Sequence, residues 1–217
     1  MPDLSGPFRW PVLLRAGALV LRPLQRADEA AWDNIRSHNS AWLGPWDATP
    51  PPEAGQPRYT FADMVHGQQE AARAWRALPW ALAWDDGWPG RPARRPGLIG
   101  QANVNGIAWG SARSATIGYW IDQRWAGRGL VPLGVALAAD YCFHTLGLHR
   151  LEIDILPENA PSHRVVAKLG FTPDGGRRSV LHINGAWRDH DAFVMTAEDA
   201  PASLVDHVLA GRPVPQA

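Results

Sequence analysis

The chain has 217 residues, of which 46% are hydrophobic and 19% charged, and its 21 basic side chains balance its 21 acidic ones. This length suits one large domain, and a formal charge of zero argues against a whole-protein role on nucleic acid or on an anionic membrane. The single cysteine, Cys142, excludes an internal disulfide framework and a thiolate zinc cluster, and no metal site is expected. With no apolar run long enough to span a membrane and no secretory pattern at the N-terminus, we expect a cytoplasmic protein.

The first half of the chain is expected to hold two short strands, two helices and a long loop. In chain order these are a strand at 12–15, a strand at 18–22, a helix at 26–39, a proline- and glycine-rich loop at 44–57 and a helix at 61–78. Apolar side chains recur at helical spacing in both helices. Pro79 is expected to end the second of them.

The second half alternates strands with helices. The expected segments are a strand at 80–84, a loop at 85–97, strands at 98–107 and 115–121, a helix at 130–146, a strand at 151–156, a helix at 160–169, and strands around 171, at 180–183 and at 192–196. The dipeptide Asn184-Gly185 predicts a tight hairpin. Interleaved strands and helices predict an α+β (mixed α/β) class. We expect one domain over 1–217, with its core at about 18–196 and a peripheral tail at 197–217 that holds a short helix ending at Gly211.

A glycine-containing turn leads from the strand at 115–121 into the helix that begins at Leu130. Gly127 and Gly129 flank Arg128 there, and Arg124 lies just before. Two glycines allow a tight turn and a close backbone approach to a ligand, while a helix N-terminus presents free N–H groups. The turn therefore suits a diphosphate or a similar anion. An ordinary strand-to-helix turn explains the glycines equally well.

A second informative segment begins at Asn159, between a strand and a helix. Asn159 and Ser162 suit the cap and the first turn of that helix. The same two side chains could instead point toward a ligand lying across the end of the strand. Lys168-Leu169-Gly170-Phe171 then ends the helix.

Taken together, these segments resemble the GNAT superfamily of acyl-CoA N-acyltransferases, and more narrowly its RimJ/RimL-type branch of ribosomal-protein N-terminal acetyltransferases. The resemblance rests on Arg-x-x-Gly-x-Gly entering a helix and on Asn-x-x-Ser followed by Lys-Leu-Gly-Phe. It is supported by the stretches at 21–24, 39–46, 117–121 and 184–190, and it runs from about residue 18 to residue 196. It implies a central, mostly antiparallel twisted sheet with two splayed parallel strands, flanked by about four helices.

The resemblance also implies acetyl-CoA as the cosubstrate. Its pyrophosphate is expected on the backbone of Trp125, Ala126, Gly127, Arg128, Gly129 and Leu130. Its pantetheine arm is expected to pair with Trp120, Ile121 and Asp122 like an added strand. Asn159 and Ser162 would bind the pantetheine or the phosphates. Arg124, Arg164 and Lys168 are candidates for the phosphate end, although solvated surface charges explain the last two as well.

The chemistry that the resemblance implies is direct acetyl transfer to an amine. The enzyme must accept a proton from the amine, polarise the thioester carbonyl and protonate the leaving sulfur. Glu152 is the preferred base because such sequences often carry Glu there, and Asp154 and His190 are further candidates. Many relatives place a tyrosine acid where this chain has Val166, so Ser162 is the candidate acid. Exposure of Glu152 and Asp154 to solvent, or their pairing with arginines, explains these two carboxylates equally well.

The acceptor is expected to be a protein or peptide N-terminal α-amine, such as that of a ribosomal protein. Trp42, Trp46, Tyr119 and Asp189 are the candidate acceptor-binding residues. A small-amine or antibiotic N-acetyltransferase and a non-catalytic acyl-CoA-binding or sensing module are the alternatives. No nucleic-acid or membrane partner is expected, and both a monomer and a homodimer are compatible with the sequence.

Overall fold

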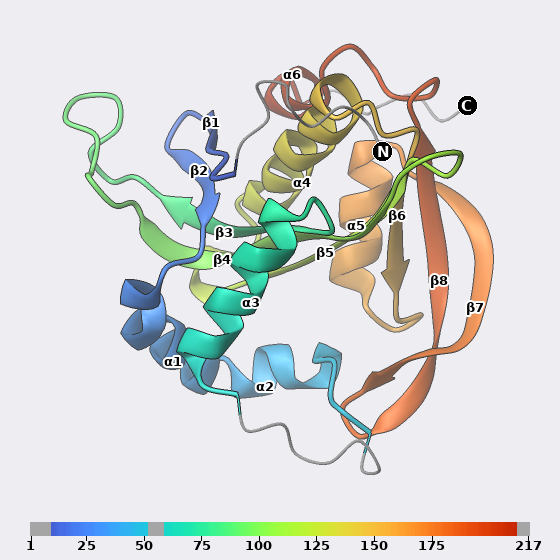
Figure 1. The fold of residues 1–217 in the computed structure, drawn as a ribbon, viewed down its shortest axis with the longest axis horizontal. Helices are drawn as coiled ribbons and strands as arrows, with labels where there is room; N and C mark the ends of the chain where they lie inside the picture. Colours follow the sequence, from blue (N-terminus) through green and yellow to red (C-terminus); the bar gives the residue numbers. More distant parts are fainter. Residues whose placement is uncertain (1–9, 52–58, 212–217) are drawn as a thin grey trace.

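The computed structural model describes residues 10–51 and 59–211, so the two ends of the chain and part of the loop expected at 44–57 lie outside it. In these residues eight strands form one twisted sheet with the order β1-β2-β3-β4-β5-β6-β8-β7 (Figure 1). The strands are β1 (Leu14–Ala16), β2 (Leu19–Pro23), β3 (Leu78–Trp84), β4 (Gly97–Ala108), β5 (Ser114–Ile121), β6 (Arg150–Ile155), β7 (Thr172–Ile183) and β8 (Ala186–Thr196). Only β5 and β6 pair in parallel, which confirms the expected mixed, mostly antiparallel sheet.

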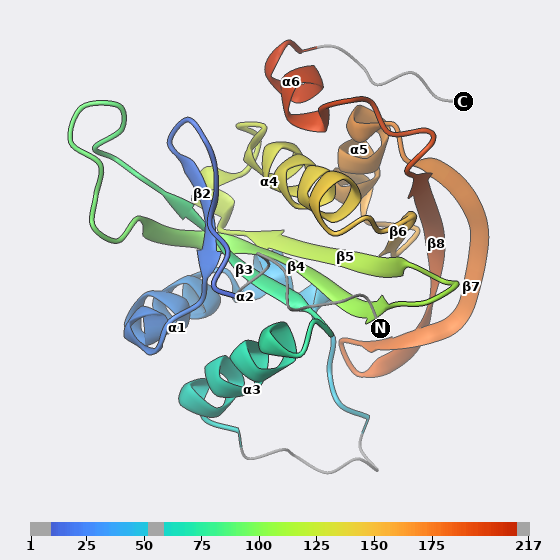
Figure 2. The same cartoon turned by 45° about the horizontal axis from the view of Figure 1, so that its top comes forward.

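Helices cover both faces of the sheet. They are α1 (Glu29–His38), α2 (Ser40–Leu43), α3 (Phe61–Arg73), α4 (Leu130–Asp140), α5 (Ala160–Leu169) and α6 (Leu204–Leu209). Figure 2 shows α4, α5 and α6 on one face and α1, α2 and α3 on the other. Four of these helices have ten or more residues, as expected. None of the helices in the described ranges is long and apolar enough to cross a membrane.

The main hydrophobic core lies between the sheet and the α4–α5–α6 layer. It contains buried side chains of six strands and includes Leu204 and Val208 of α6. Residues 204–209 are therefore part of the packed core, whereas the sequence suggested that they were peripheral. A smaller core lies under α1 and α3, around Ile35 and Val65.

Asp140 at the end of α4 fixes α6 in place. Its carboxylate accepts hydrogen bonds from the N–H groups of Leu204 (2.9 Å) and Val205 (3.2 Å) and from the Ser203 hydroxyl (3.3 Å). We expect Asp140→Ala to lower the free energy of unfolding by about 1–2 kcal/mol, because the N–H groups of Leu204 and Val205 in the first turn of α6 lose their acceptor. Urea unfolding measures this change. The control is Asp199→Ala, at an exposed residue before α6. Equal losses of stability in the two variants would contradict the role of Asp140.

One predicted helix is too long. The helix expected over 61–78 ends at Arg73, and Leu78 already begins β3. Trp75 adopts a left-handed conformation with φ of 54°, and the Arg76 N–H donates back to the Ala71 carbonyl. Helices that end this way usually carry glycine at the left-handed position. A tryptophan there gives no sequence signal.

The last hairpin is longer than predicted. Residues 172–179 were expected to lie outside the strands, yet they are the first half of β7. Two register shifts against β8 accommodate Gly175 and Ser179, which both have positive φ. Bulges of this kind keep a strand paired through residues that otherwise indicate a turn. The Asn184-Gly185 turn is confirmed, with both residues at positive φ.

Candidate active site

A gap opens in the sheet between β5 and β6. The two strands pair only over Ser114–Thr116 and Arg150–Glu152, and beyond these residues they diverge. Peptide groups alternate between the two edges of a strand. Because the Asp122 N–H donates to Ile99 on the β4 side, at 2.8 Å, the peptide groups of Tyr119 and Ile121 face the gap. This edge of β5 is therefore open to an extended ligand.

The glycine-containing turn closes one end of the gap. Gly127 and Gly129 both have φ of 75°, and no heavy atom lies within 4 Å of a Cβ built on Gly127. No hydrogen bond within the described part of the chain engages the N–H groups of residues 127–131, where α4 begins. These five N–H groups and the α4 N-terminus form a cradle for an anion.

The cations near this turn play different parts. Arg124 binds the buried Asp122 carboxylate, with its Nε 2.9 Å from Oδ2, so its charge is already paired. Arg128 lies over the Trp125 ring and donates to the Arg124 carbonyl. Lys168 places its Nζ 3.9 Å from a Cβ built on Gly129, while Arg164 is exposed on α5. Of the expected phosphate ligands, Lys168 is the cation placed beside the turn.

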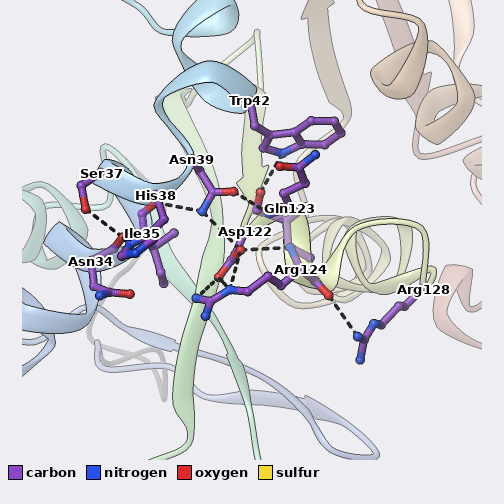
Figure 3. Close-up of polar contacts among 11 residues, drawn as sticks. Asn34, Ile35, Ser37, His38, Asn39, Trp42, Asp122, Gln123, Arg124 and Arg128 are labelled. Atoms are coloured by element: carbon purple, nitrogen blue, oxygen red, sulfur yellow. Dashed lines mark hydrogen bonds and ion pairs between the residues drawn. The ribbon is translucent and has the colours of Figure 1, made fainter.

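A polar network joins the α1–α2 junction to the residues that lead into the turn (Figure 3). Asn39 donates to Asp122 Oδ1 (3.2 Å) and accepts from the Gln123 N–H (2.8 Å). Trp42 Nε1 donates to the Ile121 carbonyl (3.2 Å). A cavity of about 330 Å³ lies here, lined by His38, Asn39, Asp122, Gln123 and Arg124. The network holds three consecutive residues at the end of β5.

The Asp122 carboxylate is the centre of this network. Burial acts to raise its pKa, but hydrogen bonds from the Arg124 side chain and backbone and from Asn39 outweigh burial and hold the pKa below its usual value. A depressed pKa means that Asp122 stabilises the fold above the pKa of the unfolded chain. This contribution is lost as the pH falls through the folded pKa.

We expect Asn39→Ala to lower the free energy of unfolding by about 1–3 kcal/mol, because the buried Asp122 carboxylate loses one of its hydrogen bonds and the Gln123 N–H loses its partner. Since these contacts position the turn, the KM for acetyl-CoA should rise more than kcat falls. Denaturant unfolding and steady-state kinetics measure the two effects. The control is Asn34→Ala on the exposed side of α1, and an unchanged KM would contradict the positioning role.

The N-terminus of α5 borders the gap on the face that carries α4. The Asn159 side chain caps this helix by accepting from the Ser162 N–H at 3.2 Å, so the capping interpretation holds for Asn159. The Tyr119 hydroxyl donates to the Ser162 carbonyl at 3.5 Å. Burial raises the pKa of Tyr119 to about 12, so the phenol stays protonated at neutral pH. Tyr119 thus places a protonated hydroxyl group beside the N-terminus of α5.

The candidate bases form a cluster on the opposite face. Residues paired across strands share a face, and the registers place Glu152, Asp154, Arg177 and His190 together. Glu152 accepts from Arg150 Nε at 2.7 Å and also pairs with Arg177. Arg177 Nε lies 2.9 Å from Asp154 Oδ1 as an ion pair without hydrogen-bond geometry. Both carboxylate oxygens of Glu152 therefore accept hydrogen bonds from arginines, whereas Asp154 has one ion pair and no such hydrogen bond among the described residues.

Asp154 has the more perturbed carboxyl group. Burial raises its pKa above the usual value, Arg177 opposes this shift and Glu152 adds to it. The buried His190 ring, with Nδ1 3.1 Å from the Arg188 carbonyl, is a further neighbour. A partly buried carboxyl group with a raised pKa is suited to accept a proton at neutral pH.

The expected acceptor-binding residues do not all lie together. Trp42 lies at the gap, where its indole N–H donates to the Ile121 carbonyl. Trp46 is half-buried, and Ala48, two residues later, pairs with Ile183 of the β7–β8 hairpin. Two of the expected residues lie away from the carboxylate cluster. Tyr119 lies on the α5 face, away from the carboxylate cluster. Asp189 is exposed on the face of β8 opposite His190, where it accepts from the Ser179 N–H at 2.7 Å and stabilises the β7 bulge.

Two residues of the site escaped the sequence analysis. Asn39 lies at the end of the helix expected over 26–39, and Arg177 lies outside the strands expected from the sequence. Counting residues back from the Asn184-Gly185 turn would predict which residue of β8 pairs with Arg177. The bulges in β7 shift this register, so the count fails. No group of three or more His, Cys, Asp or Glu side chains suited to a metal ion occurs in the described residues.

A sequence profile of the acetyltransferase (GNAT) domain matches residues 18–172. The chain thus belongs to the GNAT acetyltransferase family, which confirms the resemblance seen in its motifs. A solved structure titled "Mycobacterium smegmatis RimJ in complex with CoA-disulfide" is 33% identical, with a TM-score of 0.79, over 94% of this chain and 96% of that one. Its title supports the RimJ/RimL-type assignment.

Curated relatives differ in the acceptors that their names give. The [ribosomal protein uS5]-alanine N-acetyltransferase of Escherichia coli is 35% identical over 47% of this chain and 53% of its own length, so this chain spans about half of that relative. The spermidine N(1)-acetyltransferase of Escherichia coli is 25% identical over 80% of this chain and 83% of its own length. Membership of the family therefore leaves the acceptor to be argued from the site.

Proposed function

We propose that this protein transfers an acetyl group from acetyl-CoA to the α-amine of a protein or peptide N-terminus. The observation that carries the proposal is the open edge of β5, which leads to five unpaired N–H groups at the α4 N-terminus. The pantetheine arm of acetyl-CoA carries amide groups that can pair with the open edge of β5. Its pyrophosphate can accept hydrogen bonds from the N–H groups of the turn. The RimJ structure, whose title includes CoA, is similar over nearly the whole chain.

The residues around the gap fit acetyl-CoA without rearrangement of the turn. The space at Gly127 admits a close approach of phosphate oxygens, and Lys168 supplies a positive charge beside Gly129. The gap-facing peptide groups of Tyr119 and Ile121 offer donors and acceptors along β5. Acetyl-CoA supplies the activated acyl group, and the chain supplies the binding groups and the proton transfers.

In the proposed reaction Asp154 accepts the proton of the attacking amine, directly or through water. The Ile121 N–H polarises the thioester carbonyl, because it faces the gap and hydrogen bonds to developing negative charge stabilise the transition state. Ser162 at the α5 N-terminus and Tyr119, whose hydroxyl donates to the Ser162 carbonyl, are the candidate proton donors to the sulfur. Glu152 holds Arg177 beside Asp154.

The test is thiol release from acetyl-CoA with free peptides beside spermidine and an aminoglycoside. We expect turnover with peptides, and no turnover when the α-amine is blocked. Turnover with the small amines alone would overturn the N-terminal proposal. Binding of CoA without turnover on any amine would favour the sensing module. We further propose that residues 1–217 act as one domain in the cytoplasm, in line with the single, buried cysteine.

A further inference from the structure

Gly118 leaves an open space on the face of β5 that carries the candidate base. A Cβ built there would meet one atom within 4 Å, Asn105 Nδ2, at 4.0 Å. Its φ is not positive, so the backbone does not require glycine at this position. Gly118 lies opposite Asn103 on β4, two residues beyond the last pair of β5 and β6, Thr116 and Glu152. It lies on the same face as Asp154, across the gap between the diverging strands, because Asp154 is two residues after Glu152.

Two side-chain amides border this space with unused hydrogen-bonding atoms. Asn103 Nδ2 donates to Gln101 Oε1 at 3.4 Å, and Trp120 Nε1 donates to the same oxygen at 3.3 Å. The indole N–H can only donate, so it fixes the orientation of the Gln101 amide. Gln101 Nε2 and Asn103 Oδ1 are buried and have no hydrogen-bond partner among residues 10–51 and 59–211. Buried polar atoms without partners are rare in folded proteins, which points to a ligand that completes them.

The two unpaired atoms match the N–H and C=O of one residue in an extended peptide, because these two groups point to the same side of the chain. Gln101 Nε2 is a donor for a carbonyl oxygen, and Asn103 Oδ1 is an acceptor for an N–H. The carboxylates of Glu152 and Asp154 are already paired with Arg150 and Arg177, and Arg150 also pairs with Asp174. Selection of a peptide over a polyamine therefore rests on the two side-chain amides.

We propose that Gly118, Gln101 and Asn103 form a subsite for the backbone N–H and C=O of the second residue of the acceptor peptide. Gly118 provides the floor, Gln101 Nε2 donates to the carbonyl, and Asn103 Oδ1 accepts from the N–H. The subsite places the α-amine near Asp154 and selects peptides over amines that lack an adjacent amide. This inference rests on the proposed acetyltransferase function and specifies its substrate class.

The sharpest test compares a free tripeptide with a matched depsipeptide, in which an ester oxygen replaces the first peptide N–H. We expect the ester to have a kcat/KM about tenfold lower with the wild-type protein, because one hydrogen bond is lost. With Asn103→Ala the tripeptide and the ester should have the same kcat/KM, close to the value of the ester with the wild-type protein. Asn103→Asp keeps the accepting oxygen and should restore the difference between the two substrates.

A second variant tests the floor of the subsite. Gly118→Val fills the space while keeping a strand-compatible backbone, so kcat/KM for the tripeptide should fall at least about thirtyfold through KM. The affinity for CoA, measured by calorimetry, should stay within about threefold. Gly97→Val is the matched control, because Gly97 is a strand glycine on β4 with open space and no positive φ.

The outcomes separate this inference from the function on which it rests. Loss of discrimination in Asn103→Ala, together with loss of peptide turnover in Gly118→Val, supports the subsite. Equal turnover of peptide and ester by the wild-type protein, or full activity of Gly118→Val, would overturn the subsite alone. A wild-type protein that binds CoA and acetylates no peptide would overturn the proposed function and the subsite with it.

Discussion

Replacing Gly127 by leucine is expected to weaken CoA binding about a hundredfold, or about 2.7 kcal/mol. A leucine side chain would project into the open space where the turn presents its free N–H groups. It would also block hydrogen bonds to a phosphate, and each bond to a charged group contributes about 1.5–3 kcal/mol. Isothermal calorimetry with CoA measures the loss.

Backbone strain has to be separated from obstruction of the ligand in this experiment. A residue other than glycine in the left-handed region costs about 1–2 kcal/mol wherever it lies. Gly106 has φ of 62° and open space around it, far from the turn in sequence. Gly106→Leu should therefore destabilise the fold by a similar amount and leave CoA affinity unchanged. Equal affinity losses in the two variants would refute the role of the turn in binding.

Replacing Asp154 by asparagine is expected to lower kcat about 10²–10³-fold, because it removes the proton acceptor while keeping the shape of the side chain. In the wild-type protein kcat/KM should rise with pH as Asp154 ionises, with a midpoint above the ordinary value of 3.8. The acidic limb of the profile should disappear in Asp154→Asn. Steady-state kinetics from pH 4 to pH 8 measure both effects.

The stability of the same variant distinguishes chemistry from folding. Burial raises the folded pKa of Asp154, so its stabilising contribution is present below the unfolded pKa and is lost as the pH rises through the folded pKa. Asp154→Asn should then be at least as stable as the wild type at pH 7. Glu152→Gln removes the carboxylate that pairs with two arginines, and it should cost stability more than turnover. The reverse pattern would assign the base to Glu152.

The network around Asn39 links the two halves of the proposed reaction. The α1–α2 junction carries Trp42, and the same junction holds Asp122 and Gln123 ahead of the turn that we propose binds the pyrophosphate. A displacement of α2 by an acceptor would therefore reach the cosubstrate site through three hydrogen bonds. This connection explains why residues far from the turn in sequence are expected to alter the KM for acetyl-CoA.

The sequence by itself determined those features that depend on local chemistry. Helical apolar spacing located α4 and α5, Asn184-Gly185 defined the last hairpin, and the glycine pattern after β5 identified the turn. Such signals come from neighbouring residues, whose backbone preferences and side-chain periodicity are legible along the chain. The order and spacing of these motifs were enough to indicate the GNAT family.

Only the tertiary structure decided which side chains meet. It brought Arg177 to Asp154 across a bulged strand, placed Tyr119 and Asp189 away from the base, and left Gln101 and Asn103 beside the open floor at Gly118. Strand register, bulges and the divergence of β5 from β6 set these contacts, and they depend on pairing between segments far apart in sequence. A change of one residue in register moves every side chain to the other face of the sheet, so local patterns could not determine them.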